Sequence, residues 1–405
     1  MRFSGLPVAV GIVLLSIVLL EAQAPPAPGL IRDVASGTST LIVKGDGTVV
    51  TWGRTNTGAF TPVPVVLDLP GKVLKVAVGG GNLGSFAAYA VLEDRTVIAW
   101  GANDEGQLGN GPAGANGELG RYPKPSPTPV KVTGLTNIID IAAGNKHAVA
   151  LREDGTVWAW GTRDAGALGG GDAMPAGNLR VVSSLAPIRV PGLEGITHIA
   201  VGGTHNLALT RDGQVMSWGT GHSGELGVGT RDVGWRPAKV IGLDDVVAIA
   251  AGVSASNGVS GAVRRDGTVW MWGSGVSGMM GNGGGLLAAP DAPGGRVLLP
   301  QQVKGLVGVQ ALAIGGGNVA ALLGDGTLRM WGHNGYGEMG VGAGKNYESR
   351  PVKTGLTDVV AVYLSNMRSM AVRKDGSFWF WGFPYGGANG ALAKTQKVPT
   401  RLELP

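Results

Sequence analysis

Seven times along the chain, an Asp stands six residues before a Trp-Gly pair. The tryptophans are Trp52, Trp100, Trp160, Trp218, Trp272, Trp331 and Trp381, and successive copies are 48 to 60 residues apart. A fixed internal spacing with a variable distance between copies is typical of a repeat protein, in which each copy is one structural unit. The repeat therefore overrides the expectation from length, by which 405 residues would suggest two or three separate domains.

Each copy has the sequence of a β-hairpin. In the clearest copy, the apolar run 148–151 and the alternating run 156–160 meet at Asp154 and Gly155. Six copies have Gly after the Asp, and only Asp94 lacks it. An Asp-Gly pair between two such runs predicts a tight type I′ turn, in which both central residues have positive φ.

Two further strands are expected in each copy. Upstream of the hairpin lies a run of small residues, as in 141–144 and 249–252, which suits a strand crowded near an axis. Downstream comes Gly-x-Leu/Met-Gly, followed by a Pro-x-x-Val/Leu segment that reads as an edge strand. Four antiparallel strands in each of seven repeats of about 50–60 residues predict an all-β, seven-bladed β-propeller closed on itself.

Two stripes of large side chains are predicted to fill the space between blades. The first consists of the seven Trp-Gly tryptophans, whose rings we expect in the core. The second lies two residues earlier and consists of Val50, Ile98, Trp158, Met216, Trp270, Arg329 and Trp379. Arg329 is the exception in this stripe, and it indicates a solvated or paired position.

The copies differ in their insertions and at the C-terminus. Short insertions at 80–86 and 253–259 are expected to protrude at one rim of the disc. Long insertions rich in polar residues, Pro and Gly cover 110–127, 170–186 and 282–299 and must run over the surface. The final segment, 399–404, reads as a fourth strand that completes either the last blade or the first.

The N-terminal segment resembles a leader. Arg2 precedes a 15-residue apolar run at 6–20, which is short for a membrane-spanning helix, and small residues follow it. We therefore predict a signal peptide or membrane anchor at 1–24, cleaved after Ala22 or Ala24 or retained. Residues 25–29 are expected to form a Pro-rich linker and 30–405 the propeller. The expected location is outside the cytoplasm: periplasmic, cell-surface or secreted.

Composition limits the possible chemistry. The absence of Cys excludes disulfides and thiolate metal sites, and the net charge of +5 is dispersed without a run of five cations. Phosphate binding needs clustered cations, so we expect no nucleic-acid partner. Contact with a membrane is expected only through a retained N-terminal anchor, and we expect a monomer.

The repeat is similar to that of the regulator-of-chromosome-condensation family. Its small-residue strand, Ala-Gly-x-x-His, Ala-Leu-x-x-Asp-Gly-x-Val-x-x-Trp-Gly, Gly-Gln-Leu-Gly and Pro-x-x-Val match this chain over residues 30–405. The resemblance implies a seven-bladed propeller. It implies much less about activity, because one fold hosts many functions.

No catalytic, cofactor or metal site is predicted. His147 and His205 occupy the His position of the repeat, where we expect them to cap a turn or to bond a neighbouring blade. The Asp residues of the hairpins are expected to serve their turns. The segment 340–345 has the wrong spacing for a phosphate-binding loop, and Asn346 stands where such a loop has Ser or Thr.

The predicted recognition elements are aromatic and Arg residues outside the hairpin pattern, which we place in loops. Seven residues are predicted to contact a partner: Tyr122, Trp235, Arg236, Tyr336, Tyr347, Arg350 and Tyr385. The expected function is an exported, non-enzymatic scaffold that binds another protein through variable rim loops. The alternatives are a carbohydrate or cell-envelope binder, with aromatic side chains grouped at one rim, and a hydrolase or lyase, with carboxylates or a His pair converging at the channel mouth.

Overall fold

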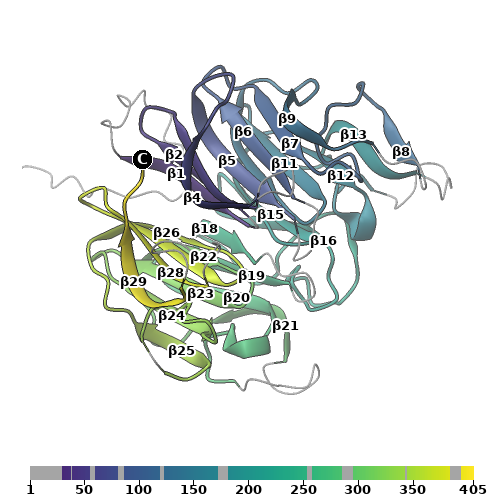
Figure 1. Ribbon diagram of the computed structural model, residues 1–405. Coiled ribbons are helices and arrows are strands. Elements are labelled where there is room, and N and C mark those ends of the chain that lie inside the picture. Colours follow the sequence, from purple (N-terminus) through teal and green to yellow (C-terminus); the bar gives the residue numbers. More distant parts are fainter. Residues whose placement is uncertain are drawn as a thin grey trace, which may run out of the picture.

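Seven antiparallel sheets surround a common centre (Figure 1). The computed structural model describes residues 30–37, 39–54, 60–80, 86–118, 123–171, 181–252, 258–284, 295–342, 344–383 and 394–405. The predicted all-β, seven-bladed propeller is confirmed, with one sheet for each sequence repeat.

Blades 1 to 4 contain the first half of the chain. Blade 1 consists of β1 (Ile31–Ser36), β2 (Ser39–Lys44), β3 (Val49–Arg54) and β4 (Phe60–Leu67). Blade 2 consists of β5 (Val73–Gly79), β6 (Ala87–Leu92), β7 (Val97–Gly101) and β9 (Ser126–Lys131). Blade 3 consists of β10 (Ile138–Ala143), β11 (His147–Arg152), β12 (Val157–Thr162) and β13 (Val181–Arg189), joined by the short β8 (Asn116–Glu118). Blade 4 consists of β14 (Ile196–Val201), β15 (His205–Thr210), β16 (Val215–Gly219) and β17 (Gly234–Lys239).

Blades 5 to 7 complete the ring. Blade 5 consists of β18 (Val246–Ala251), β19 (Val259–Arg264), β20 (Val269–Ser274) and β21 (Arg296–Gln302). Blade 6 consists of β22 (Val309–Ile314), β23 (Asn318–Leu323), β24 (Leu328–His333) and β25 (Tyr347–Lys353). Blade 7 consists of β26 (Val359–Leu364), β27 (Arg368–Arg373), β28 (Phe378–Gly382) and β29 (Gln396–Leu402). Two short 3₁₀ turns, η1 (Asp164–Gly166) and η3 (Val276–Gly278), follow the third strands of blades 3 and 5.

The first strand of each blade lies at the hub. These strands contact the first strands of the neighbouring blades, and β1 contacts both β5 and β26. Small residues such as Ala142 and Ala250 allow seven backbones to approach one another there. The small-residue runs therefore line the axis, as the sequence indicates.

Blade 7 closes against blade 1 through side chains. The last strand, β29, pairs with β28, so the C-terminal segment completes the last blade and not the first. Trp52 packs edge-on against Phe378, with ring centroids 6.2 Å apart. The fully buried Arg368 donates from Nη2 to the carbonyl oxygen of Gly37, 2.6 Å away. In Figure 1 the purple first blade accordingly lies beside the yellow last blade.

The seven tryptophans are buried, with exposed fractions between 0% and 4%. In five copies the indole Nε1 donates to a backbone carbonyl of the preceding blade: Trp160 to Gln107, Trp218 to Ala167, Trp272 to Glu225, Trp331 to Met279 and Trp381 to Glu338. The acceptor always lies in the Gly-x-Leu/Met-Gly segment. This segment is therefore the socket for the Trp of the next blade.

The hairpin turns differ from the prediction. Gly47 has a φ of +84°, whereas no Asp of these turns has a positive φ, so the predicted type I′ turn is wrong. The amide of Gly47 donates to the carbonyl of Lys44, 2.9 Å away, as in the longer loop where a type I turn precedes a left-handed residue. Asp46 accepts the amide of Thr48 at 2.9 Å, which is the expected turn role for Asp.

The second stripe is less buried than predicted. Val50 and Ile98 are buried, but Trp158, Met216, Trp270, Arg329 and Trp379 are only partly so. Trp158, Met216, Trp270 and Trp379 nevertheless pack against the core, so the prediction that this stripe is mostly core packing is confirmed, with Arg329 as the predicted exception.

One insertion adds a strand that the sequence did not predict. Residues 116–118 of the blade 2 insertion form β8, which pairs with the outer edge of β13 in blade 3. The amide of Leu185 also donates to the carbonyl of Ala115, 2.9 Å away. The short insertions at 80–86 and 253–259 lie largely outside the described residues.

Candidate partner-binding surface

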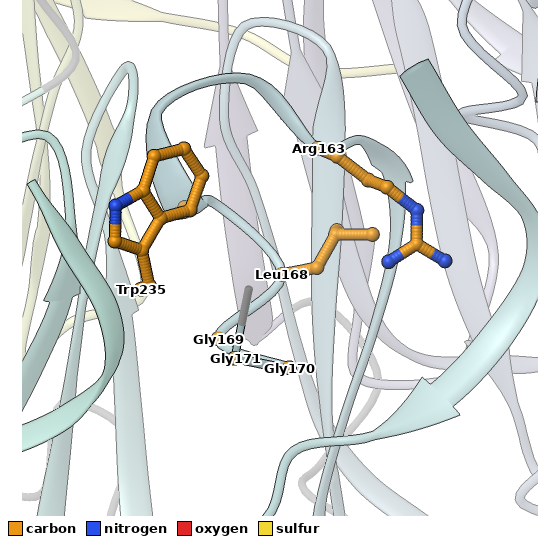
Figure 2. A pocket seen from close by; sticks show the side chains of 7 residues that line it. Arg163, Leu168, Gly169, Gly170, Gly171 and Trp235 are labelled. Carbon is orange, nitrogen blue, oxygen red and sulfur yellow. The ribbon is translucent and has the colours of Figure 1, made fainter. Parts of the chain in front are cut away.

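Trp235 and Arg236 lie at the junction of blades 3 and 4. Both belong to the outer strand β17, so their predicted placement in a loop is wrong. The Trp235 side chain is 36% exposed, and the Arg236 guanidinium lies against Gly171 of blade 3. Figure 2 shows the indole of Trp235 and the guanidinium of Arg163 on opposite sides of this glycine-rich turn. The space between them is about 10 Å³, enough for one water molecule, so this junction is closed.

Tyr336 and Tyr347 lie on blade 6. Tyr336 follows β24 in a loop and is 37% exposed, whereas Tyr347 lies in strand β25 and not in a loop as predicted. Tyr336 packs edge-on against Phe383 of blade 7, with ring centroids 5.1 Å apart. Tyr347 stands opposite His333 in the β24–β25 ladder. Blade 6 therefore carries a small aromatic group at one end of its outer strands.

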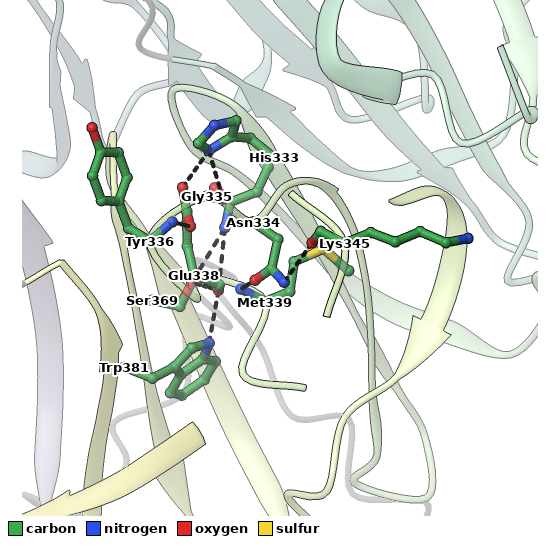
Figure 3. Close-up of polar contacts among 10 residues, drawn as sticks. His333, Asn334, Gly335, Tyr336, Glu338, Met339, Lys345, Ser369 and Trp381 are labelled. Carbon is green, nitrogen blue, oxygen red and sulfur yellow. Dashed lines mark hydrogen bonds and ion pairs between the residues drawn. The ribbon is translucent and has the colours of Figure 1, made fainter. Parts of the chain in front are cut away.

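Glu338 fixes the loop that presents Tyr336 (Figure 3). Its carboxylate, only 1% exposed, contacts Nδ1 of His333 at 2.5 Å and accepts the amide of Tyr336 at 2.8 Å. The hydrogen bond to Glu338 raises the pKa of His333. The backbone carbonyl of Glu338 accepts the indole of Trp381 at 2.7 Å and the hydroxyl of Ser369 at 2.6 Å. One residue thus holds the loop and joins blade 6 to blade 7.

A groove opens at the outer junction of blades 5 and 6. Its volume is about 830 Å³. Strand β21 and the connection after it supply Gln302 and Lys304, strands β20 and β24 supply Trp270 and Arg329, and β25 supplies Arg350. Both neighbouring outer strands thus contribute to one concave surface. Its size falls within the range of ligand-binding clefts.

The cation Arg329 lies beside this groove because blade 6 places its Arg on the third strand, whereas three other blades place an Arg at the end of the second strand. In three blades an Arg at the end of the second strand stacks on a Trp of the third: Arg152 on Trp158, Arg264 on Trp270 and Arg373 on Trp379, at 4.7, 5.7 and 5.6 Å. In blade 6 the two positions hold Leu323 and Arg329 instead. Leu323 packs against the core, and the charge is placed on the third strand, beside the groove.

A glycine positions the second Arg of the groove. A Cβ on Gly283 would lie 2.7 Å from Nη2 of Arg350, so the guanidinium rests on the bare backbone of the preceding blade. Gly283 also has a φ of +88° and donates its amide to the carbonyl of Ser349 at 2.8 Å. Arg350 is therefore held in place although its side chain is exposed.

The predicted contact residues do not form one surface. The structure places Trp235 and Arg236 on blade 4 and Tyr336, Tyr347 and Arg350 on blade 6. Tyr122 and Tyr385 lie outside the described residues. Of the predicted set, only Arg350 lines the groove. Lys304, Gln301 and Gln302 were not predicted, and the only signal in the sequence was the irregular Arg329.

His147 and His205 link neighbouring blades, as expected. His147 Nε2 lies 2.8 Å from Oδ1 of Asn206, and His205 Nε2 lies 3.0 Å from Oγ of Ser260. Burial lowers the pKa of His147 to about 4, and burial together with the charge of His147 lowers the pKa of His205 to about 3. Both imidazoles are therefore neutral at pH 7 and serve the packing of blades.

Two searches of the described residues bear on other functions. In the ranges that the structure describes, no group of three or more His, Cys, Asp or Glu side chains could hold a metal ion. In the same ranges, no helix is long and apolar enough to cross a membrane.

Comparison with known sequences identifies the repeat. The "Regulator of chromosome condensation (RCC1) repeat" matches residues 96–151, 154–209 and 212–256, and a second model of this repeat matches 196–225. The Ultraviolet-B receptor UVR8 of Arabidopsis thaliana is 29% identical over 396 residues, which cover 93% of this chain and 81% of the receptor. The E3 ubiquitin-protein ligase HERC2 of Homo sapiens is 28% identical over 360 residues, which cover 85% of this chain but only 7% of the ligase.

Solved structures share the fold. Human WBSCR16 superposes with a TM-score of 0.68 at 23% identity, covering 85% of this chain and 86% of that one. Yeast RCC1 (Prp20), crystallised with Kap60, superposes with a TM-score of 0.67 at 23% identity, covering 87% and 80% of the two chains. The chain therefore carries regulator of chromosome condensation (RCC1) repeats, folded as a seven-bladed β-propeller.

Proposed function

We propose that this propeller is a non-enzymatic scaffold that binds another protein at its outer edge. The observation that carries the proposal is the groove between blades 5 and 6, lined by Trp270, Arg329 and Arg350. Trp and Arg are the side chains most enriched at the energetic centres of protein interfaces. Since blades hold these residues on strands, little conformational entropy is lost when a partner docks.

Relatives support a role in protein binding. Yeast Prp20 has been crystallised with Kap60, and its structure is described together with its binding to Gsp1p and histones. Kap60, Gsp1p and histones are partners of that protein. At 23% to 24% identity, the likeness supports only a shared fold. The shared feature is a rigid propeller that presents its surface to other proteins.

The predicted rim insertions at 80–86 and 253–259 lie largely outside the described residues, so we assign recognition to the groove rather than to those loops. The alternative carbohydrate binder requires exposed aromatic rings grouped at one rim. Trp235 and Tyr336 lie on blades 4 and 6, and Tyr336 is engaged edge-on by Phe383. This arrangement gives weaker support for stacking on a sugar than the groove gives for a protein partner.

We also propose that the chain is exported. This proposal rests on the apolar run at 6–20 and the small residues after it, which lie outside the described residues. Export would bring the groove into contact with proteins of the cell envelope or the medium.

An affinity-capture experiment tests the scaffold proposal. The full chain is immobilised and exposed to cell-envelope extract, beside a groove variant carrying Lys304→Gln, Arg329→Met and Arg350→Gln. A charge-matched control carries Lys131→Gln, Arg211→Gln and Lys239→Gln, which alter three exposed cations on blades 2 and 4. We expect a protein that the wild type and the control capture and the groove variant does not. Equal capture by all three would refute a role for the groove.

A further inference from the structure

The groove between blades 5 and 6 is strongly cationic. Among its described lining residues, Lys304, Arg329 and Arg350 are positive and none is acidic. The nearby Glu348 does not line it and lies 4.0 Å from Lys345. Asp325 interacts electrostatically with Arg329, but its Oδ1 already accepts the amide and the hydroxyl of Thr327 at 2.9 and 2.7 Å. The local charge is therefore available to an anionic partner.

Arg329 carries a donor that needs an acceptor. Its Nη1 is closed off from solvent and has no hydrogen-bond partner among the described residues. A donor without an acceptor costs free energy. Because this Nη1 is closed off from solvent, a partner's carboxylate would pair with the part of the guanidinium that lines the groove. Because the aligned residue in every other blade is uncharged, this cation departs from the repeat, which is expected where function rather than packing selects the residue.

Apolar surface flanks the charges. The half-buried indole of Trp270 lines the groove, and so does the buried Leu306. Val307, next in the chain to Leu306, is 66% exposed. A segment that fits this surface combines negative charges with apolar side chains.

We propose that this groove binds an extended acidic segment of a protein partner, with carboxylates at Arg329, Arg350 and Lys304 and apolar side chains at Trp270 and Val307. The proposal rests on the proposed scaffold function and names the chemistry of its partner. A nucleic acid fits less well, since strong phosphate binding uses a longer array of cations and does not use the exposed apolar side chain of Val307.

A synthetic peptide tests this proposal without knowledge of the natural partner. The probe is a short fluorescent peptide of alternating Glu and Leu, and its counterpart has Gln in place of Glu. We expect the full chain to bind the Glu peptide at low salt, as measured by fluorescence anisotropy. Arg329→Met should weaken this binding about tenfold or more, because it removes the positive charge of Arg329 and introduces the residue type that blade 4 has at the same position, Met216. Lys131→Gln should leave it unchanged.

The outcomes separate the two proposals. Binding of the Glu peptide that is lost in Arg329→Met and at high salt supports the acidic segment. If the Glu and Gln peptides bind equally or not at all, while the groove variant still loses the captured protein, the acidic segment is wrong and the scaffold proposal stands. If a single-stranded oligonucleotide of equal charge binds more tightly than the Glu peptide and is lost in Arg329→Met, the partner class is wrong. If neither probe nor captured protein responds to the groove variants, both proposals are wrong.

Discussion

The indole Nε1 of Trp160 donates a hydrogen bond to the backbone carbonyl of Gln107, 2.8 Å away in the preceding blade. The same bond recurs in four further copies, always between a Trp and the Gly-x-Leu/Met-Gly segment before it. Each Trp thus fills the core of its own blade junction and fixes its position by a directional bond. The Gly-x-Leu/Met-Gly segment and the Trp of the next blade therefore recur together in the sequence because they contact each other in the structure.

Replacement of Trp160 should destabilise the ring far more than replacement of Tyr347. Trp160→Ala removes a fully buried indole, for which we expect a loss of about 3–5 kcal/mol in the free energy of unfolding. Tyr347→Ala, at a half-buried position, should cost about 1 kcal/mol. Thermal and urea unfolding followed by tryptophan fluorescence and circular dichroism measure both. Equal losses would contradict the assignment of Trp160 to the core.

Gly109 should not tolerate a side chain, because the indole of Trp160 lies directly beside it. Its φ is +61°, and a Cβ would lie 2.7 Å from Nε1 of Trp160. Gly134 has a φ of +71° with nothing within 4 Å of such a Cβ, and it is the matched control. Gly134→Ala should cost about 1 kcal/mol from backbone strain alone, and Gly109→Ala about 1–3 kcal/mol more from the steric clash. Similar unfolding midpoints for the two variants would contradict the close packing of Trp160 against Gly109.

Acid should destabilise the ring partly through His205. Its pKa is about 3 in the folded chain, below the unfolded value of about 6.5, so its contribution is present above pH 6.5 and is lost as pH falls toward 3. The loss should approach about 1.4 kcal/mol for each pH unit below ~6.5. Asp140 acts in the opposite direction, because burial raises its pKa to about 6 and its contribution is lost as pH rises through that value.

Comparison of variants isolates the histidine. The unfolding free energy of His205→Asn should fall less steeply between pH 7 and pH 4 than that of the wild type. Ser260→Ala removes the hydrogen-bond partner but keeps the imidazole, so it should retain the wild-type slope. Urea unfolding at four or five pH values provides the data, and identical slopes for His205→Asn and the wild type would exclude His205 as a source of acid sensitivity.

Arg368 should stabilise the junction at which blade 7 closes the ring against blade 1. Its guanidinium donates to Gly37 at 2.6 Å and to Oγ1 of Thr40 at 3.5 Å, across the junction of blades 7 and 1. Arg368→Met leaves the partly buried Gly37 carbonyl without this donor, so we expect a loss of about 2–4 kcal/mol and earlier cleavage of blade 1 in limited proteolysis. Arg373→Met, which removes an Arg stacked on Trp379, should cost less than about 1 kcal/mol. Equal protease resistance would show that Arg368 does not hold the junction.

The sequence predicts the architecture because the architecture is repetitive. Seven equal spacings between Asp and Trp-Gly determine the number of blades, and burial of every Trp follows from that pattern. Local detail was harder to predict. Asp-Gly fits two kinds of turn, and they are distinguished by the turn Asp, which has no positive φ here although Gly47 does. Strand β8 has three residues and is stabilised by pairing with β13 of another blade, which no local pattern reveals.

The site was less predictable than the fold. Arg329 was visible as a cation in an apolar stripe, but Lys304, Arg329 and Arg350 meet only because blades 5 and 6 pack side by side. Aromatic residues outside the hairpins proved to be a weaker guide. Trp235 and Tyr347 lie in outer strands, and the junction at Trp235 is closed.

Site-specific photocrosslinking tests the central claim, recognition at the outer groove, most directly. A photoreactive amino acid replaces Gln302, which lines the groove, or Lys131, which occupies the same ladder position in blade 2. The two full-length variants are irradiated in cell-envelope extract, and covalent adducts are detected by mass shift. We expect a defined protein adduct at position 302 and none at position 131. An adduct at position 131 with none at position 302, or no difference between them, would contradict a partner-binding groove between blades 5 and 6.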